Sequence, residues 1–251
     1  MENKSVNTGK ILCVVPARYA SVRLPGKPLA KVNKLPLVMW TYKRAYESHA
    51  FSNVVVATDD GRIYDAVKSH GGEVIMTSTQ HKSGTDRMME VARSMPFEYL
   101  VNLQGDEPET PVRILQDFSQ NLHRLDNNSL LTCVSNATIK EKMDPNVVKA
   151  VLNCRKEALY FSRAPIPFER DGDEKGAYKH IGIYGFTREG LERFCSFPRG
   201  TLEMQEKLEQ LRALEFGMNI HCLEYDYTSQ GIDTPEDLEE FRRRVGSQVK
   251  F

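Results

Sequence analysis

Apolar runs of strand length alternate with helical patterns through the first hundred residues, and this alternation constrains the fold most strongly. The expected strands are Ile11–Val15, Val54–Thr58, Val74–Thr77 and Tyr99–Leu103. The expected helices run from Pro36 to about Ser48, from Asp60 to His70, and onward from Gly84. Such alternation indicates βαβ units with right-handed crossovers, and therefore an α/β fold around a mostly parallel sheet. The loops that follow the strands then gather at one edge of that sheet, where a site is usually built.

The second half of the chain carries more varied patterns. Further strands are expected over Leu130–Val134, Val147–Leu152, Ala158–Arg163, His180–Phe186 and Ile220–Tyr225. Two more helices are expected: one continuous over Thr201–Phe216, with an apolar stripe through Met204, Leu208, Leu211 and Leu214, and one over Pro235–Val245. Charge and glycine mark 168–178 as an exposed loop. No linker divides the chain, so residues 11–251 are expected to form a single domain after a flexible tail over residues 1–10.

The chain is electrically neutral overall, with 34 Lys and Arg against 34 Asp and Glu among its 251 residues. A general nucleic-acid or membrane-surface binder would carry a basic excess, so the sequence predicts no nucleic-acid partner and no membrane association. No apolar run approaches the roughly 20 residues that span a bilayer. The five cysteines are scattered without a Cys-x-x-Cys pair, which is typical of reduced, buried thiols in a cytoplasmic protein.

A basic, proline-rich loop follows the first expected strand. The segment Pro16–Pro28 holds three cations, one glycine and three prolines. Because phosphates bind at the carboxyl ends of parallel strands, Arg18 and Lys27 are the expected phosphate contacts, aided by N–H groups of the loop. The alternative is a surface turn whose cations are merely solvated. The residue after Lys27 is Pro28 and not Ser or Thr, so this is no Walker-type loop and a metal ion would need other ligands.

Two acidic residues offer oxygen ligands of the kind that Mg²⁺ prefers. Asp106 follows the apolar run Tyr99–Leu103 and is expected at the same sheet edge as the basic loop. Mg²⁺ takes hard oxygen ligands, commonly one or two carboxylates plus substrate phosphates. Asp233, in a Gly-Ile-Asp-Thr-Pro run, is a candidate second ligand, although an isolated Asp ahead of a helix is more often its N-cap.

Other polar residues give weaker signals. Arg87 falls in the first turn of an expected helix, where the helix dipole disfavours a cation, which hints at a ligand or a carboxylate partner. Ser83, just before that helix, has the position of a cap. Glu206 and Glu209 would share the polar face of the helix expected over 201–216, and such a face is ordinarily solvated. A lone histidine such as His180 is more often structural than catalytic.

Taken in chain order, the motifs resemble those of the CMP-KDO synthetases, the 3-deoxy-manno-octulosonate cytidylyltransferases. The matching segments are Pro-Ala-Arg-Tyr-Ala-Ser (16–21), Arg-Leu-Pro-Gly-Lys-Pro (23–28), Val-Ala-Thr-Asp (56–59), His-Lys-Ser-Gly-Thr-Asp-Arg (81–87), Val-Asn-Leu-Gln-Gly-Asp-Glu-Pro (101–108), Pro-Asn-Val-Val-Lys (145–149), Ala-Leu-Tyr-Phe-Ser-Arg-Ala (158–164), Lys-His-Ile-Gly-Ile-Tyr-Gly (179–185), Leu-Glu-Gln-Leu-Arg (208–212) and Gly-Ile-Asp-Thr-Pro-Glu-Asp-Leu (231–238). Each motif alone is modest evidence, but their joint order over nearly everything after Lys10 is strong evidence.

The resemblance implies a Rossmann-like nucleotidyltransferase core with a mixed, mostly parallel sheet and a smaller subdomain for sugar binding and dimerisation, in a cytoplasmic homodimer. The implied reaction is transfer of CMP from CTP to the anomeric hydroxyl of 3-deoxy-D-manno-octulosonate (KDO), with release of pyrophosphate, for lipopolysaccharide biosynthesis. The implied site comprises Arg18 and Lys27 on the triphosphate, Ser83 and Arg87 near the nucleotide, Asp106 and Asp233 on Mg²⁺, and Gln104, Arg163, His180, Tyr184 and Glu209 around the sugar. The KDO carboxylate would pair with Arg163 or His180.

No residue is an obvious nucleophile, so we expect direct in-line attack on the α-phosphorus, with catalysis by positioning and charge stabilisation.

The chain departs from the family pattern at three places. Lys34-Leu35-Pro36 replaces a more usual Gly-Lys-Pro, Glu109-Thr110-Pro111 stands where an apolar pair is more usual, and the loop Arg170–Tyr178 is short. That loop precedes a sugar-side motif, so 8-amino-KDO or another 3-deoxy-ulosonic acid stays open as the acceptor. A cytidylyltransferase for sialic acid and a non-catalytic nucleotide-binding protein are further alternatives. The intact sugar-side motifs argue against the first, and the joint presence of both aspartates argues against the second.

Overall fold

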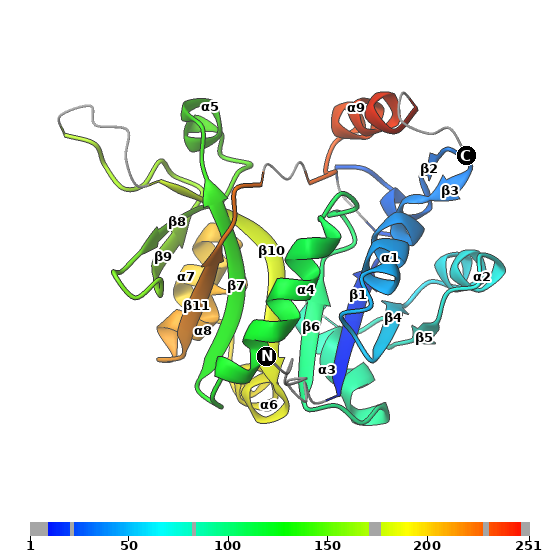
Figure 1. Cartoon of the computed structure of the whole chain (residues 1–251), viewed down its shortest axis with the longest axis horizontal. Coiled ribbons are helices and arrows are strands. Elements are labelled where there is room, and N and C mark those ends of the chain that lie inside the picture. The colour runs from blue at the N-terminus through cyan, green and yellow to red at the C-terminus, as the bar shows by residue number, and fades with distance from the viewer. Residues whose placement is uncertain (1–9, 21–22, 82–83, 171–176, 228–230, 247–251) are drawn as a thin grey trace, which may run out of the picture.

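The computed structural model describes residues 10–20, 23–81, 84–170, 177–227 and 231–246. Within them, helices cover both faces of a nine-stranded sheet (Figure 1). The main path of the sheet follows the order β11 (Asn219–Glu224), β7 (Ser129–Asn136), β10 (Tyr178–Thr187), β6 (Tyr99–Leu103), β1 (Ile11–Ala17), β4 (Asn53–Thr58) and β5 (Val74–Met76). Residues 1–9 of the tail expected over residues 1–10, and the candidate Ser83, lie outside the described residues.

One strand of that path, β10, runs against its neighbours. It pairs antiparallel with β6 and β7, whereas β1 pairs parallel with β4 and β6, β4 with β5, and β7 with β11. Two further strands, β8 (Lys149–Leu152) and β9 (Ala158–Ser162), extend the sheet antiparallel from β10 as a smaller appendage. The mixed, mostly parallel sheet predicted from the sequence is therefore confirmed.

Alternation along β1 divides its side chains between two cores. Ile11, Cys13 and Val15 belong to the first core, and Leu12 and Val14 to the second. The first core lies beneath α1 (Leu37–Glu47), α2 (Gly61–Ser69) and α4 (Val112–Asn121), and the second beneath α3 (Gly84–Ser94), α6 (Arg188–Ser196) and α8 (Leu211–Glu215). A strand buried on both faces reads as an unbroken apolar run, which is why the parallel strands could be located from sequence.

A third, smaller core joins the two ends of the chain. The hairpin of β2 (Lys31–Val32) and β3 (Leu35–Pro36) packs beneath α9 (Pro235–Gly246), with Val32, Leu37 and Phe241 buried together. Trp40 meets Phe241 edge-on at 5.5 Å between ring centroids. As Figure 1 shows, α9 consequently lies beside the first βα segment, near the carboxyl end of β1.

The continuous helix expected over Thr201–Phe216 is wrong. The chain forms α7 (Thr201–Glu206) and α8, separated by a turn in which Lys207 is left-handed, with φ 56° and ψ 44°. Of the expected apolar stripe, Leu208 and Leu211 are buried and Leu214 packs against the second core, but Met204 is 50% exposed. The break has a physical cause: a buried ion pair between Glu203 and Arg212 joins the two short helices, and it requires them to fold against each other.

Other expectations differ in extent. The remaining strands lie within three residues of their expected ends, whereas α4, α6 and the short α5 (Ile139–Met143) were not among the predicted helices. Cys13, Cys133 and Cys222 are buried as expected, but Cys154 is exposed. Among the described residues, no helix has the length and apolar character to cross a bilayer.

Candidate active site

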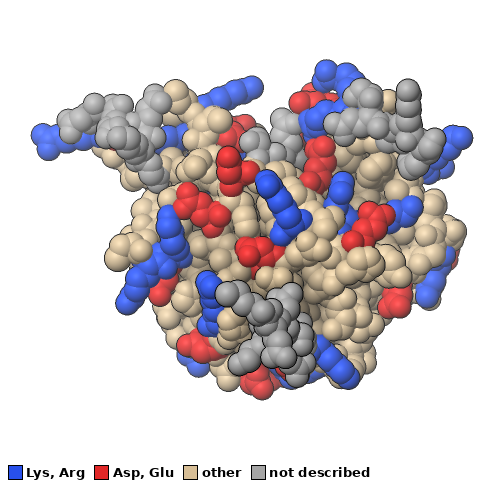
Figure 2. All heavy atoms as spheres, viewed as in Figure 1, with Lys and Arg blue, Asp and Glu red and all other residues tan. Residues whose placement is uncertain are grey.

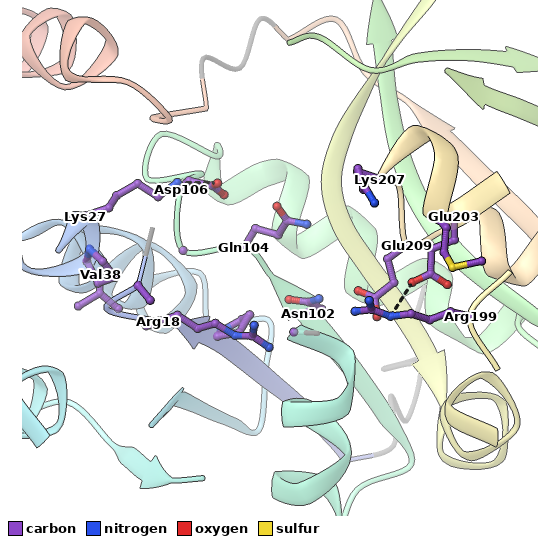
Figure 3. Close-up of a pocket in the computed structure, with 17 residues that line it drawn as sticks. Arg18, Lys27, Val38, Asn102, Gln104, Asp106, Arg199, Glu203, Lys207 and Glu209 are labelled. Atoms are coloured by element: carbon purple, nitrogen blue, oxygen red, sulfur yellow. Dashed lines mark hydrogen bonds and ion pairs between the residues drawn. The ribbon is translucent and has the colours of Figure 1, made fainter. Parts of the chain in front are cut away.

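A cleft of about 500 Å³ opens at the carboxyl ends of β1 and β6, a volume that suits a small-molecule ligand (Figure 3). Its first wall, formed by the loops after β1 and β6, carries Arg18, Lys27 and Asp106; Asn102 and Gln104 lie between the walls; the opposite wall, around α7, carries Arg199, Glu203, Met204, Lys207 and Glu209. In the space-filling view the surface is hollowed between α5 and α9, and charges of both signs intersperse on the rest of that face (Figure 2).

The loop after β1 is held by its own residues. Gly26 donates its N–H to the carbonyl of Tyr19 at 3.0 Å and adopts φ 70°, a left-handed conformation that favours glycine. A Cβ on Gly26 would lie 3.3 Å from the Tyr19 ring, and the Arg62 guanidinium lies 3.3 Å from the centroid of that ring. Lys27 follows at the start of the short helix η1 (Lys27–Leu29), where Pro28 is buried. The loop therefore presents Lys27 from a fixed backbone.

Lys27 joins three distant segments of the chain. Its Nζ donates to Asp106 Oδ2 at 2.9 Å, to Asp233 Oδ1 at 3.1 Å and to the carbonyl of Ile232 at 2.8 Å. Burial lowers the pKa of Lys27, but the two carboxylates outweigh burial and leave its pKa raised. Asp233 also pairs with Arg23 at 2.9 Å. Lys27, Asp106 and Asp233, each singled out from the sequence, therefore lie at one site. In this structure the Lys27 ammonium binds the two carboxylates.

Asp233 is not the N-cap of α9. That role belongs to Thr234, whose hydroxyl accepts from Asp237 N–H at 3.2 Å, while Asp237 accepts from Thr234 N–H at 2.8 Å. The Asp233 carboxylate is therefore free of the capping role that its position suggested, and it faces the cations of the loop after β1.

The carboxylates fit a hard divalent cation. Asp106 Oδ1 is buried and makes no hydrogen bond within the described ranges. A buried carboxylate oxygen is normally paired, so this atom has room for a hydrogen-bond donor or a cation. No group of three or more His, Cys, Asp or Glu residues suited to a metal occurs in those ranges. Two carboxylates completed by substrate phosphates are nevertheless a usual ligand set for Mg²⁺. Asp106 and Asp233 are the residues that would hold it.

Arg18 lies at the end of β1 with a second cation nearby. Burial lowers the pKa of Arg18, and the proximity of Arg87 lowers it further. Arg87 is fully buried on α3 and donates to Asp59 Oδ2 at 2.5 Å and to the Thr77 hydroxyl. The carboxylate partner that its helix position suggested is therefore present, and Arg87 does not line the cleft. Arg18, which lines the cleft, is therefore the guanidinium that this wall offers to an anion.

Gln104 extends into the cleft because β10 has a glycine opposite it. A Cβ on Gly182 would lie 2.9 Å from Cδ of Gln104, so any larger residue would displace that side chain. Asn102, two residues before Gln104 and on β6, also lines the cleft and is 4% exposed. Its Oδ1 makes no hydrogen bond to any described residue, so it offers an acceptor to a ligand. Figure 3 shows both amides between the two walls.

Three of the expected sugar contacts do not line the cleft in the described structure. His180 packs behind the site between Phe161 and Tyr184, with Nε2 at 2.9 Å from the Thr132 hydroxyl, and burial lowers its pKa to about 3. Tyr184 is held by Gln210 at 3.2 Å. Arg163 donates to the backbone carbonyls of Glu206 at 3.0 Å and Pro145 at 3.1 Å. These three residues are half-buried and are held by neighbouring segments outside the lining of the cleft.

The wall around α7 was missed by sequence reasoning, apart from Glu209. Glu203 accepts two 2.7 Å hydrogen bonds from the Arg212 guanidinium and lies 3.7 Å from Arg199. Glu209 lies 3.6 Å from Arg212. Glu209 was expected on a solvated helix face and Met204 on an apolar stripe, whereas both line the cleft beside the break at Lys207. No pattern in the sequence predicted the break between α7 and α8.

The chain matches known cytidylyltransferases over most of its length. The cytidylyltransferase family model matches residues 12–220. The 3-deoxy-manno-octulosonate cytidylyltransferase of Escherichia coli is 39% identical over 96% of this chain and 98% of its own length, and that of Solibacter usitatus is 44% identical over 96% of each. Together with the α/β sheet and the cleft at its carboxyl edge, the family match defines a cytidylyltransferase.

Solved structures agree with this class. A CMP:2-keto-3-deoxy-manno-octonic acid synthetase complexed with CTP is 39% identical, with a TM-score of 0.90 over 96% of this chain and all of the other. A 4-diphosphocytidyl-2C-methyl-D-erythritol synthase from Anaerococcus prevotii, at 12% identity and a TM-score of 0.62 over 95% of this chain and 99% of the other, shares the fold alone. The chain belongs to the 3-deoxy-manno-octulosonate cytidylyltransferase, or CMP-KDO synthetase, family.

Proposed function

We propose that this protein transfers CMP from CTP to the anomeric hydroxyl of KDO and releases pyrophosphate. The observation that carries the proposal is the likeness, over 96% of the chain, to a CMP-KDO synthetase solved with CTP. The cleft supports it, because one wall gathers Arg18 and Lys27 while the other presents Glu209 and polar groups suited to a sugar. A triphosphate and a hydroxylated acceptor can then lie on opposite walls.

The residues of the chain act by binding and positioning. Arg18 and Lys27 would offset the negative charge of CTP, which otherwise repels the incoming hydroxyl. Gln104 and Glu209 would hold hydroxyls of the acceptor so that the anomeric oxygen lies in line with the α-phosphorus. Asp106 and Asp233 would hold Mg²⁺, which when bound supplies charge neutralisation at the phosphates. The metal assignment is supported by the buried Oδ1 atom of Asp106, which has no hydrogen-bond partner among the described residues.

The test is an acceptor panel. The purified protein is incubated with CTP and Mg²⁺, and pyrophosphate is followed with KDO, 8-amino-KDO and N-acetylneuraminate in separate reactions. Release with KDO is the expected outcome. Release only with 8-amino-KDO would revise the acceptor, and no release with any of them would contradict the enzymatic proposal. Omission of Mg²⁺ is expected to abolish release, and full turnover without any divalent cation would contradict the metal assignment.

We also propose that the protein works as a homodimer in the cytoplasm, in lipopolysaccharide biosynthesis. The family resemblance supports the compartment and the pathway. An exposed apolar patch supports the dimer: Ile139 and Met143 on α5 are 61% and 64% exposed, and Phe168 is 90% exposed. The ion pair between Lys142 and Glu169 holds α5 against the segment that bears Phe168. Large exposed apolar side chains on two adjoining segments commonly mark an interface.

A further inference from the structure

We infer that Lys207 anchors the carboxylate of the acceptor sugar acid, and so makes the cleft selective for acceptors that carry a carboxylate. The inference rests on the proposed function and deepens it. An acceptor bound against the wall around α7 brings its carboxylate to that wall, because the nucleotide triphosphate occupies the wall of Arg18 and Lys27. A cation on the α7 wall is therefore the group to look for.

The acids of the α7 wall already have cationic partners. Arg212 forms a two-bond pair with Glu203, both at 2.7 Å, and lies 3.6 Å from Glu209. Arg199 also faces Glu203, at 3.7 Å. The wall thus holds two carboxylates, each with a guanidinium beside it, before Lys207 is considered.

Lys207 adds a positive charge that those acids do not balance. Within the ranges that the structure describes, its ammonium makes no hydrogen bond or ion pair, although it lines the cleft. Figure 3 shows Lys207 extending into the cleft from the α7 side and Gln104 extending from the other side. On the opposite wall, by contrast, the ammonium of Lys27 contacts two carboxylates and a carbonyl. A carboxylate bound near Lys207 would complete its environment.

The backbone conformation of Lys207 also supports a role in ligand binding. Its φ of 56° and ψ of 44° are left-handed, at the end of α7, where glycine or asparagine is the favoured residue. A lysine in this conformation carries a backbone cost that its side chain does not recover by any contact with the described residues. Recognition of a ligand gives a reason for a lysine at this position.

Two other cations expected to meet the carboxylate are differently engaged. Arg163 contacts the carbonyls of Glu206 and Pro145, and His180 lies behind the cleft against the Thr132 hydroxyl. The low pKa of His180, a consequence of burial, keeps its imidazole neutral at physiological pH. Neither side chain lines the cleft, and Arg199, which does, faces Glu203, so Lys207 is the group suited to this role.

The test substitutes Lys207 without disturbing its backbone. Lys207→Asn removes the ammonium and retains a residue that accepts the left-handed conformation, and Lys207→Arg retains the charge. Lys34→Asn is the matched control, since Lys34 is an exposed lysine at φ 67° in the β2–β3 turn, outside the cleft. Steady-state kinetics with KDO and CTP, melting temperature, and calorimetric binding of KDO are measured for all four proteins.

We expect Lys207→Asn to raise the KM for KDO about tenfold, as loss of a charged hydrogen bond would, with the KM for CTP unchanged and the melting temperature equal or higher. Lys207→Arg and Lys34→Asn should stay near the wild type. KDO methyl ester, which lacks the charge, should bind the wild type and Lys207→Asn equally. Equal KDO affinity in the wild type and Lys207→Asn would overturn the inference, as would equal loss of affinity for KDO and its ester.

The two levels of the proposal fail differently. A wild type that releases no pyrophosphate but binds KDO less tightly after Lys207→Asn would contradict the proposed reaction and support the anchor. A wild type that turns over normally, with an unchanged KM in Lys207→Asn, would contradict the anchor alone. Absence of KDO binding to the wild type would contradict both.

Discussion

Asp106 joins Lys27 to the segment that precedes α9. Its Oδ2 contacts Lys27 Nζ at 2.9 Å, and its backbone carbonyl accepts from Ile232 N–H at 3.0 Å. We expect Asp106→Asn to lower kcat about 100-fold or more, because the amide is a weak ligand for Mg²⁺ and leaves the phosphate charge less neutralised. The protein should remain folded, since Lys27 keeps Asp233 and the Ile232 carbonyl.

Pyrophosphate release over an Mg²⁺ titration and circular dichroism check this prediction. Glu109→Gln is the control, because it removes a nearby carboxylate that pairs with Arg244 at 2.6 Å, outside the cleft. Near-normal turnover of Asp106→Asn with an unshifted Mg²⁺ dependence would remove Asp106 from the metal site.

His180 makes the stability of the protein sensitive to acid. Its pKa falls from 6.5 to about 3 in the folded protein because the ring is buried. Between these pKa values the unfolded chain binds a proton that the folded protein does not, so the free energy of unfolding rises with pH across that window. From pH 7 down to pH 5 this one group should remove up to about 2 kcal/mol of stability.

Urea unfolding at pH 7 and pH 5 measures this effect. His180→Gln should lose less stability over the same interval, because glutamine has no proton to gain. An equal loss in the wild type and His180→Gln would assign the acid sensitivity to other groups.

At the level of single residues, position after a strand was the informative signal. Arg18, Asp106 and Gln104 follow β1 or β6 directly, and the parallel sheet brings their segments to one edge. The positions of Arg163 and His180 could not be foreseen, because a motif specifies the segment but not whether its side chain enters the cleft or packs behind it. Lys207 belongs to no motif singled out from the sequence, and its place in the cleft depends on the break between α7 and α8.

Among the elements, α7 and α8 form a unit held by one buried ion pair. Glu203 and Arg212 are 7% and 3% exposed, and the Arg212 guanidinium also lies 4.8 Å from the Phe194 ring centroid on α6. We expect Arg212→Met to destabilise the protein by about 3 kcal/mol, because it removes both 2.7 Å hydrogen bonds from the buried Glu203 carboxylate and leaves it the half-exposed Arg199, 3.7 Å away.

Chemical denaturation of Arg212→Met measures that cost. The double variant Glu203→Leu/Arg212→Met is the control, and it should recover most of the lost stability, since it removes the uncompensated charge. Equal destabilisation of the single and double variants would show that packing, and not charge, governs the α7–α8 contact.

The elements differed in how well sequence could locate them. Strands of the parallel sheet are buried on both faces, so each is an apolar run with little ambiguity. The region over 201–216 has helical spacing throughout, but local periodicity contains no information about the tertiary ion pair that divides it. Similarly, α4 was overlooked although Ile114, Leu115 and Phe118 have helical spacing, and it follows Pro111, an ordinary start of a helix.

At the scale of the whole molecule, the apolar patch around Phe168 predicts self-association. Introduction of a charge there should oppose burial of the patch, so we expect Phe168→Glu to convert a dimer into a monomer without unfolding it. Light scattering of the wild type should give twice the mass of one chain. Met76→Glu, at a residue 47% exposed on β5 at the other end of the sheet, is the control and should stay dimeric. A monomeric wild type would contradict the dimer.

The ion-pair cluster of Lys27 has a consequence for how the protein is made. Lys27 and Asp233 are separated by 206 positions along the chain, yet their side chains meet at 3.1 Å. At translation rates of about 5–20 residues per second, Asp233 is synthesised about 10 to 40 seconds after Lys27. During that interval four strands of the sheet are already available, because β1, β4, β5 and β6 lie within the first 103 residues. The nascent chain therefore carries Arg18, Lys27 and Asp106 well before Asp233 is made, and until then Lys27 lacks one of its two carboxylate partners.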